Sequence, residues 1–146
     1  MGPREPSVAA VVIDTNVVAY HLLGVKEHRD VLSDLFMADL EFVAPDSLKA
    51  EVLNVLWLAI RIGAIETEEP LSRLDTVDQL IDRSTPTSTI WAGALSLAVT
   101  SNRSPYDTLF VAAAEREHVE MLTYDQPLRA AFPATAVDPG EFLSRT

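Results

Sequence analysis

The stretch VAAVVIDTN, from Val8 to Asn16, decides the fold of this chain. VAAVVI is short, apolar and rich in β-branched residues, which is typical of a strand buried in a parallel sheet. Asp14 and Thr15 follow at once with side chains that can cap a helix, and VVAYHLL continues that helix to Gly24. A buried strand that runs directly into a helix predicts a parallel βα unit, with Asp14 at the carboxyl end of the strand.

The rest of the chain continues this alternation. We expect further strands at 41–44, 81–83, 119–123 and 135–137, and helices at 26–40, 46–62, 66–80, 87–99, 104–118 and 127–131, with a terminal turn at 140–144. Strands that alternate with helices predict an α/β fold. The specific expectation is a three-layer α/β/α sandwich around a central parallel sheet of about four or five strands.

Length and composition predict one globular domain over residues 1–146, with a core from about 8 to 144. A domain of this size buries roughly 68–70% of the surface of its unfolded chain, and 48% of the residues are hydrophobic. The absence of cysteine excludes disulfides, thiolate zinc sites and cysteine catalysis. It agrees with a cytoplasmic location, and neither a signal peptide nor an apolar run long enough to cross a membrane is visible.

The charge of the chain is strongly acidic. Eleven basic residues against 22 acidic ones give a net charge of −11, which argues against a general nucleic-acid coat protein. Nine of the eleven basic residues are arginines, whose forked side chains match phosphate geometry. A polyanionic substrate would therefore need arginines, a metal ion or a basic partner to offset the repulsion.

Four acidic residues stand where an apolar segment ends or a helix begins: Asp14, Glu51, Asp107 and Asp125. In an open parallel sheet, ligands bind outside the carboxyl ends of the strands. Carboxylates brought there from distant parts of the chain would offer oxygen ligands to a hard divalent cation. Each aspartate alone could equally be a helix cap, and Glu51 alone a solvated helix residue. Only the four together indicate a metal site.

The segments around these residues resemble a known family. VVIDTNVVAYHLL, PDSLKAEVLNVLW, SPYDTLFVAAAE and MLTYDQPL, between Val11 and Leu128, resemble in order the four acidic motifs of PIN-domain ribonucleases. The size of the chain is similar to that of the small VapC-type toxins of prokaryotic toxin–antitoxin pairs. The resemblance implies a PIN-like fold, a Mg²⁺- or Mn²⁺-dependent endoribonuclease, a homodimer and a cognate antitoxin protein as partner.

The resemblance also implies roles for individual residues. The family's catalytic metal carboxylates fall on Asp14, Glu51, Asp107 and Asp125. Asn16 and Thr123 match supporting positions that contact the metal's waters or the loops of the site. Because Mg²⁺ prefers one or two protein carboxylates and keeps several waters, we expect Asp14 and Asp107 to bind it directly. Glu51 and Asp125 would hold waters or a second ion, and the number of ions stays open.

Two basic residues lie near the motifs in sequence, Arg103 before Asp107 and Lys49 before Glu51. Either could contact RNA phosphates or be a solvated charge. For Trp57 and Trp91 we expect packing in the core or in an interface. Two alternatives to a toxin nuclease stay open: a standalone RNA-processing nuclease with the PIN-like fold, and a non-catalytic PIN-like binding or scaffold protein.

Overall fold

The computed structural model describes the backbone of residues 8–65 and 68–145, and the side chains of 8–65 and 72–145. Within these residues five strands form one parallel sheet in the order β3-β2-β1-β4-β5. The strands are β1 (Ala9–Ile13), β2 (Leu40–Pro45), β3 (Arg83–Thr85), β4 (Met121–Leu122) and β5 (Ala136–Val137). The predicted parallel sheet of four or five strands is confirmed.

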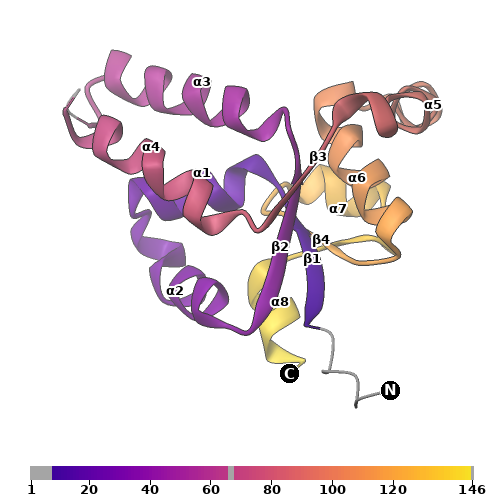
Figure 1. The fold of residues 1–146 in the computed structure, drawn as a ribbon, viewed down its shortest axis with the longest axis horizontal. Coiled ribbons are helices and arrows are strands. Elements are labelled where there is room, and N and C mark those ends of the chain that lie inside the picture. Colours follow the sequence, from indigo (N-terminus) through magenta and orange to yellow (C-terminus); the bar gives the residue numbers. More distant parts are fainter. Residues whose placement is uncertain (1–7, 66–67, 146) are drawn as a thin grey trace, which may run out of the picture.

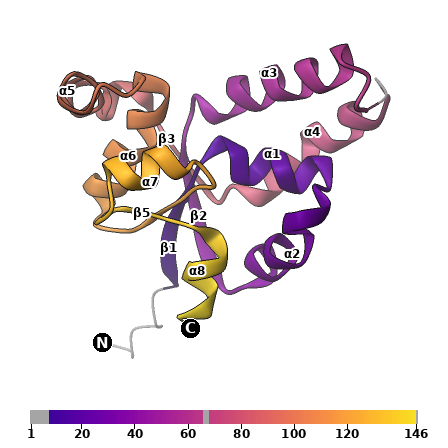
Figure 2. The same ribbon diagram turned by 180° about the vertical axis from the view of Figure 1, so that it is seen from behind.

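Helices cover both faces of this sheet (Figure 1). One side carries α1 (Thr15–Leu23), α2 (Arg29–Met37), α3 (Leu48–Arg61) and α4 (Glu68–Leu80), and the other carries α5 (Trp91–Ser101), α6 (Pro105–Glu117) and α7 (Gln126–Ala131). The last helix, α8 (Pro139–Ser144), packs against α2 beside the start of β1, as the view from behind also shows (Figure 2). The predicted three-layer α/β/α sandwich is therefore confirmed.

The first strand and helix form as their sequence indicates. β1 lies between β2 and β4, and its last three residues are buried, as expected for an apolar strand in the middle of a parallel sheet. Asp14 is the N-cap of α1, and Gly24 ends the helix in the left-handed conformation, with φ 63°. A left-handed residue after the last turn satisfies carbonyl groups that have no partner within the helix, and glycine adopts it without steric cost.

The segment predicted as one helix over 26–40 is shorter and begins differently. A 3₁₀ turn occupies Lys26–His28, and α2 then ends at Met37. Leu40 already pairs with Ala9 in the sheet, so the chain needs extended backbone from there. The spacing of apolar residues could not predict where the helix ends, because the residues of β2 adopt the strand conformation by pairing with β1.

The strand predicted over 81–83 lies at Arg83–Thr85 instead. Asp82 explains the shift, because its backbone N–H donates to the carbonyl of Phe42 and its carboxylate accepts from the N–H of Phe42 (2.8 Å). These bonds fix the entry of the chain into the sheet, where Val43 is in register with Arg83. The helix predicted from Glu66 is α4, and residues 66–67 lie outside the described part.

α6 anchors the second helical layer. Its run from Thr108 to Ala114 is buried, which places the helix directly on β1 and β2. Ser104 caps it, accepting from the N–H of Tyr106, and Pro105 takes the first turn, where its missing N–H costs nothing. The hydroxyl of Thr108 donates to the carbonyl of Ala94 (2.7 Å) and so ties α6 to α5. This packing holds Asp107 at the start of α6 in a defined position.

The two tryptophans do not pack in the core, contrary to the first part of our expectation. Trp57 is 54% exposed on α3 and Trp91 is 62% exposed on α5. The core instead consists mainly of aliphatic side chains of the strands and of the helix faces that cover them, together with Phe42 and Phe110. Among the described residues, no helix combines the length and the apolar character needed to cross a membrane.

Candidate active site

The acidic residues meet where the strand order reverses. From β1 the chain proceeds outward to β2 and β3, whereas β4 and β5 lie on the other side of β1. The carboxyl ends of β1 and β4 therefore form the switch point at which open α/β sheets bind ligands. Ile13 pairs with Leu122 there, and the N–H of Asp14 donates to the carbonyl of Leu122 (3.0 Å). This pairing brings Asp14 next to Thr123.

Asp14 is buried, with 5% of its surface exposed, and donors surround its carboxylate. Oδ1 accepts from the N–H of Thr15 (2.8 Å), which is the helix-capping bond. Oδ2 accepts from the hydroxyl of Thr123 (2.8 Å) and, at 3.3 Å, from the amide of Asn16. The residue is thus a cap, as the simplest interpretation predicted, and it is also tied to a strand more than a hundred residues away.

Asn16 and Thr123 hold the two loops of the site together. The hydroxyl of Thr123 accepts from the amide nitrogen of Asn16 (3.1 Å) and from the N–H of Asp125 (3.0 Å). The amide oxygen of Asn16 accepts from the N–H of Tyr124 (3.0 Å). The resemblance implied that Asn16 and Thr123 contact either the metal's waters or the loops of the site. The hydrogen bonds of both residues are contacts with the loops.

Replacing Thr123 with Val is expected to destabilise the protein by about 1–3 kcal/mol, because Val keeps the shape but leaves one buried and two half-buried polar partners without the hydroxyl. Thr108 provides the control, since it is equally buried and makes a single bond, to a helix carbonyl. Thr108→Val should cost about 1 kcal/mol. Urea unfolding measures both values, and a loss at Thr123 no larger than at Thr108 would contradict the role assigned to this network.

Glu51 reaches the site from the first turn of α3. Ser47, four residues earlier, donates its hydroxyl to Oε2 of Glu51 (3.2 Å). The pKa of Glu51 is raised to about 7, mainly by burial and also by the negative charges of Asp14 and Asp107, while the hydrogen bond from Ser47 acts in the opposite direction. Glu51 is therefore not a solvated helix residue, because it senses two of the other carboxylates.

Asp107 and Asp125 share a cation supplied by the chain itself. Nη2 of Arg103 lies 3.1 Å from Oδ2 of Asp107 and 3.2 Å from Oδ2 of Asp125. The other oxygen of Asp125 accepts from the N–H of Leu128 (2.9 Å) and caps α7. Asp107 lies in the first turn of α6, which Ser104 caps. From the sequence, Arg103 could contact RNA phosphates or be a solvated charge, whereas the structure places it between two of the proposed metal carboxylates.

The carboxylates repel one another in this arrangement. The pKa of Asp14 is raised to about 6, mainly by burial and in part by the charges of Asp107 and Asp125, against the hydrogen bonds from Thr123 and Thr15. Burial also raises the pKa of Asp107, which Arg103 lowers and Asp125 raises. Buried carboxylates that destabilise one another are costly to keep for structure alone, and such groups cluster at functional sites.

Comparison with known proteins agrees with this geometry. The family model described as PIN domain matches residues 11–131, which include all four acidic motifs. The chain belongs to the PIN domain family. PIN domains are generally nucleases and generally depend on divalent metal ions. No curated protein sequence matches the chain significantly.

Three solved structures share the PIN domain fold at low sequence identity. PAE2754 from Pyrobaculum aerophilum is 20% identical, with a TM-score of 0.71 over 94% of this chain and 88% of that one. A chain of a toxin–antitoxin complex from Klebsiella pneumoniae is 16% identical, with a TM-score of 0.57 over 88% and 97%. FitAcB from Neisseria gonorrhoeae is 20% identical, with a TM-score of 0.57 over 89% and 98%.

The donor chemistry of the site fits a hard divalent cation such as Mg²⁺ or Mn²⁺. The ligands available are carboxylate oxygens, and burial together with the neighbouring negative charges raises the pKa values of Asp14 and Glu51. Among the described residues, three buried side-chain polar atoms have no hydrogen-bond partner: Oγ1 of Thr15, Nε of Arg103 and the hydroxyl oxygen of Tyr124. Within the described residues, however, no three acidic or histidine side chains stand close enough together to hold an ion. Arg103 interacts with two of the candidate ligands instead.

Three further residues bear on the site: Lys49, which was predicted to contact RNA or solvent, and two supporting residues that were not predicted. Lys49 forms an ion pair with Asp78 of α4 (2.6 Å), and its contact with RNA stays a prediction. Sequence reasoning missed Ser47 and Arg129; Arg129 donates to the carbonyl of Thr123 (3.0 Å) and braces that loop. The i, i+4 spacing of Ser47 and Glu51 was a usable signal. Nothing in the sequence indicated the contact of Arg129.

Proposed function

We propose that this PIN domain is a Mg²⁺- or Mn²⁺-dependent endoribonuclease of the cytoplasm that cleaves RNA phosphodiester bonds. The observation that supports the proposal is that Asp14, Glu51 and Asp107 are near enough to one another for their charges to raise pKa values among them, while Arg103 joins Asp107 to Asp125. Arg103 offsets the charge of Asp107 and Asp125 only, so a bound cation is the simplest physical reason for the presence of Asp14 and Glu51 beside them.

The residues divide the work by position. Asp14 and Asp107 are the proposed direct ligands, and Glu51 and Asp125 complete the acidic shell. The bound cation would supply activation of the attacking water and neutralise charge that develops on the phosphoryl group. Thr123 and Asn16 orient Asp14 through the bonds described above, and Ser47 orients Glu51.

Purified protein should cut a pool of structured RNAs when Mn²⁺ or Mg²⁺ is present and should stop when EDTA removes the ion. Separation of the products on a sequencing gel shows whether cleavage is internal, as an endonuclease requires. Cleavage that persists in EDTA would point to a contaminating ribonuclease or to a different mechanism. No cleavage of any RNA, together with no binding of Mn²⁺, would favour the non-catalytic scaffold instead.

We further propose that the nuclease is the toxin of a type II toxin–antitoxin pair. The fold shared with a chain of the Klebsiella pneumoniae toxin–antitoxin complex supports this role. Exposed apolar side chains on α3 and α5 also support binding of a protein partner. A small neighbouring gene whose product binds this chain and stops RNA cleavage would identify the antitoxin. A chain that cleaves RNA but has no such partner would be a standalone RNA-processing nuclease.

A homodimer is the proposed assembly, with α5 as the contact. Trp91, Leu95 and Val99 follow one another at intervals of four residues, so they lie on one face of α5, and each is more than 60% exposed. A hollow of about 480 Å³ beside them, lined in part by Pro105 and Leu109, offers room for apolar side chains of a second copy.

Leu95→Glu is expected to convert the dimer into a monomer of 16.0 kDa, because it places a charge in the apolar contact. Leu53→Glu on α3 is the matched control, since Leu53 is an exposed leucine on another helix (52% exposed, against 61% for Leu95), and it should leave the dimer intact. Sedimentation equilibrium measures the mass. Dissociation by Leu53→Glu alone would move the dimer contact to α3.

A further inference from the structure

We propose that Arg103 is an internal counter-cation of the acidic site, which competes with the divalent ion for Asp107 and Asp125 and has to leave them when the ion binds. The inference rests on the proposed metal-dependent function and adds to it a control of metal affinity that is built into the chain. Its basis is the position of one guanidinium group among the candidate ligands.

Arg103 joins carboxylates from two separate elements. It lies between α5 and α6, and its Nη2 contacts Asp107 at the start of α6 and Asp125 after β4. All three side chains retain between 27% and 29% exposure, so the group is neither sealed in the core nor free in solvent. A positive charge at this point partly offsets the repulsion between Asp107 and Asp125.

The bonding of Arg103 is incomplete, which makes it displaceable. A single nitrogen is shared between two carboxylates, and Nε is buried without a hydrogen-bond partner among the described residues. Arg83 is bound differently. Its two terminal nitrogens donate hydrogen bonds to both carboxylate oxygens of Glu117, and its Nε donates to Glu41. Two parallel bonds make the strong arginine–carboxylate pair, and Arg103 has no such pair with either partner.

The guanidinium and a divalent ion require the same oxygens. An ion bound to Asp107 would lie within a few ångströms of Nη2, where two positive charges repel each other strongly. Metal binding therefore includes the cost of moving Arg103 away. Removal of its charge should strengthen metal binding, which is opposite to the effect expected if Arg103 merely held the site in shape.

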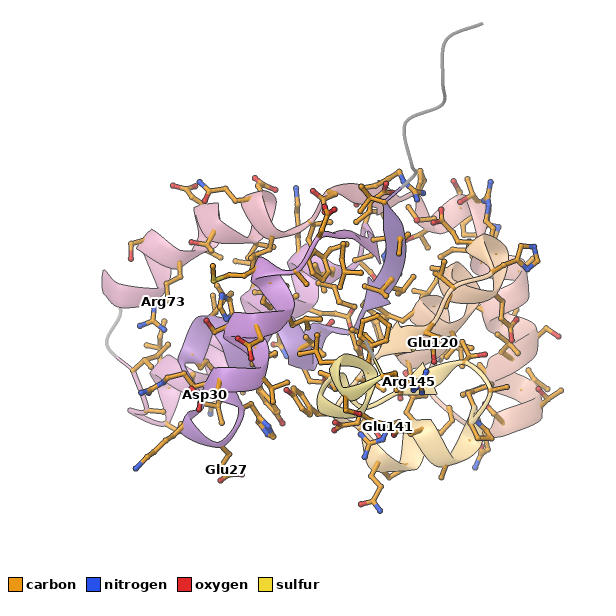
Figure 3. All side chains as sticks on the ribbon, turned by 90° about the horizontal axis from the view of Figure 1, so that it is seen from below. Glu27, Asp30, Arg73, Glu120, Glu141 and Arg145 are labelled. Carbon is orange, nitrogen blue, oxygen red and sulfur yellow. The ribbon has the colours of Figure 1, made fainter. Side chains whose placement is uncertain are left out.

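Calorimetric titration with Mn²⁺ on the full chain tests the proposal. Arg103→Gln should bind Mn²⁺ about tenfold more tightly than the wild type, as expected for loss of one positive charge a few ångströms from the ion. Arg145→Gln is the matched control, because it removes the same charge at the other end of the sheet, where Arg145 pairs with Glu120 and Glu141 (Figure 3). Its affinity should equal that of the wild type.

The outcomes separate this proposal from the proposed function. If the wild type binds Mn²⁺ and Arg103→Gln binds it equally or more weakly, the proposed competition is wrong. The proposed metal site is then unaffected. Failure of the wild type and of both variants to bind Mn²⁺ overturns the metal site and this inference with it. If only Arg103→Gln binds Mn²⁺, the competition is supported, and Arg103 then prevents binding in the wild type.

A second measurement uses the wild type and does not depend on a variant that folds. Nitrogen NMR of the arginine side chains, with diamagnetic Mg²⁺ as probe, should show the Nε–H signal of Arg103 shifting and becoming more mobile as the site saturates. The signal of Arg83, which remains paired, should not change. An Arg103 signal that is unaffected by saturating Mg²⁺ overturns the proposal.

Discussion

Asp14→Asn is expected to lower divalent-dependent RNA cleavage more than about 100-fold, because even partners outside the first shell of a metal typically contribute 10- to 100-fold. Asn retains an oxygen that can accept the capping bond from the N–H of Thr15, so α1 should still form. What the substitution removes is the negative charge on a buried group, which is the property proposed to hold the ion.

Asp30→Asn is the control for this prediction, since Asp30 is exposed in the first turn of α2 (Figure 3) and is not one of the proposed site residues. It removes the same charge and should leave cleavage unchanged. Initial rates on one RNA substrate measure the effect, and circular dichroism checks the fold. A folded Asp14→Asn variant that keeps more than a tenth of the wild-type rate would contradict the assignment of Asp14 as a metal ligand.

The metal-free protein is expected to become less stable as the pH rises from 4 to 7. Asp14 has an ordinary pKa of 3.8 when unfolded and about 6 when folded, because it is buried among like charges. Between these two values the folded state binds more protons than the unfolded state, so the free energy of unfolding falls with rising pH. The stabilisation is complete below pH 3.8 and is lost above about pH 6, with a size of about 3 kcal/mol.

Unfolding in urea with EDTA, at intervals from pH 4 to 7.5, measures this dependence. Subtraction of the curve for Asp14→Asn isolates the contribution of Asp14, since the amide does not titrate. The variant should be more stable than the wild type at pH 7.5, and Mn²⁺ should restore the wild type through binding to its folded state. A difference between the two curves that is flat with pH would contradict the buried, repelling environment of Asp14.

The existence of the acidic site could be predicted because strands and helices carry local signals. The apolar run before Asp14 predicts a buried strand, and a parallel sheet directs the ends of such strands to one edge. The pattern Ser104-Pro105 predicts the helix start that carries Asp107, since both residues suit the first positions of a helix. Interactions between residues close together in the sequence decide where these strands and helices begin, so the sequence is enough to predict them.

Features that depend on distant contacts could not be predicted in the same way. β3 lies two residues later than expected because of the bonds between Asp82 and Phe42, which are 40 residues apart. The spacing of Trp57 and Trp91 predicted packing in the core or in an interface, yet both side chains are more than half exposed on α3 and α5. Helical spacing defines a face but does not tell whether anything covers it.

The sequence by itself determined the parallel α/β sandwich and the four carboxylates at one edge of its sheet. These features can be predicted without knowledge of the tertiary contacts, because they depend on apolar periodicity, capping residues and the order of the acidic motifs along the chain. Only the tertiary structure decided how these carboxylates are held: Thr123 bound to Asp14, and Arg103 bridging Asp107 and Asp125. Such bonds depend on positions to within an ångström, which the packing of α6 and β4 against β1 sets and which no pattern along the chain encodes.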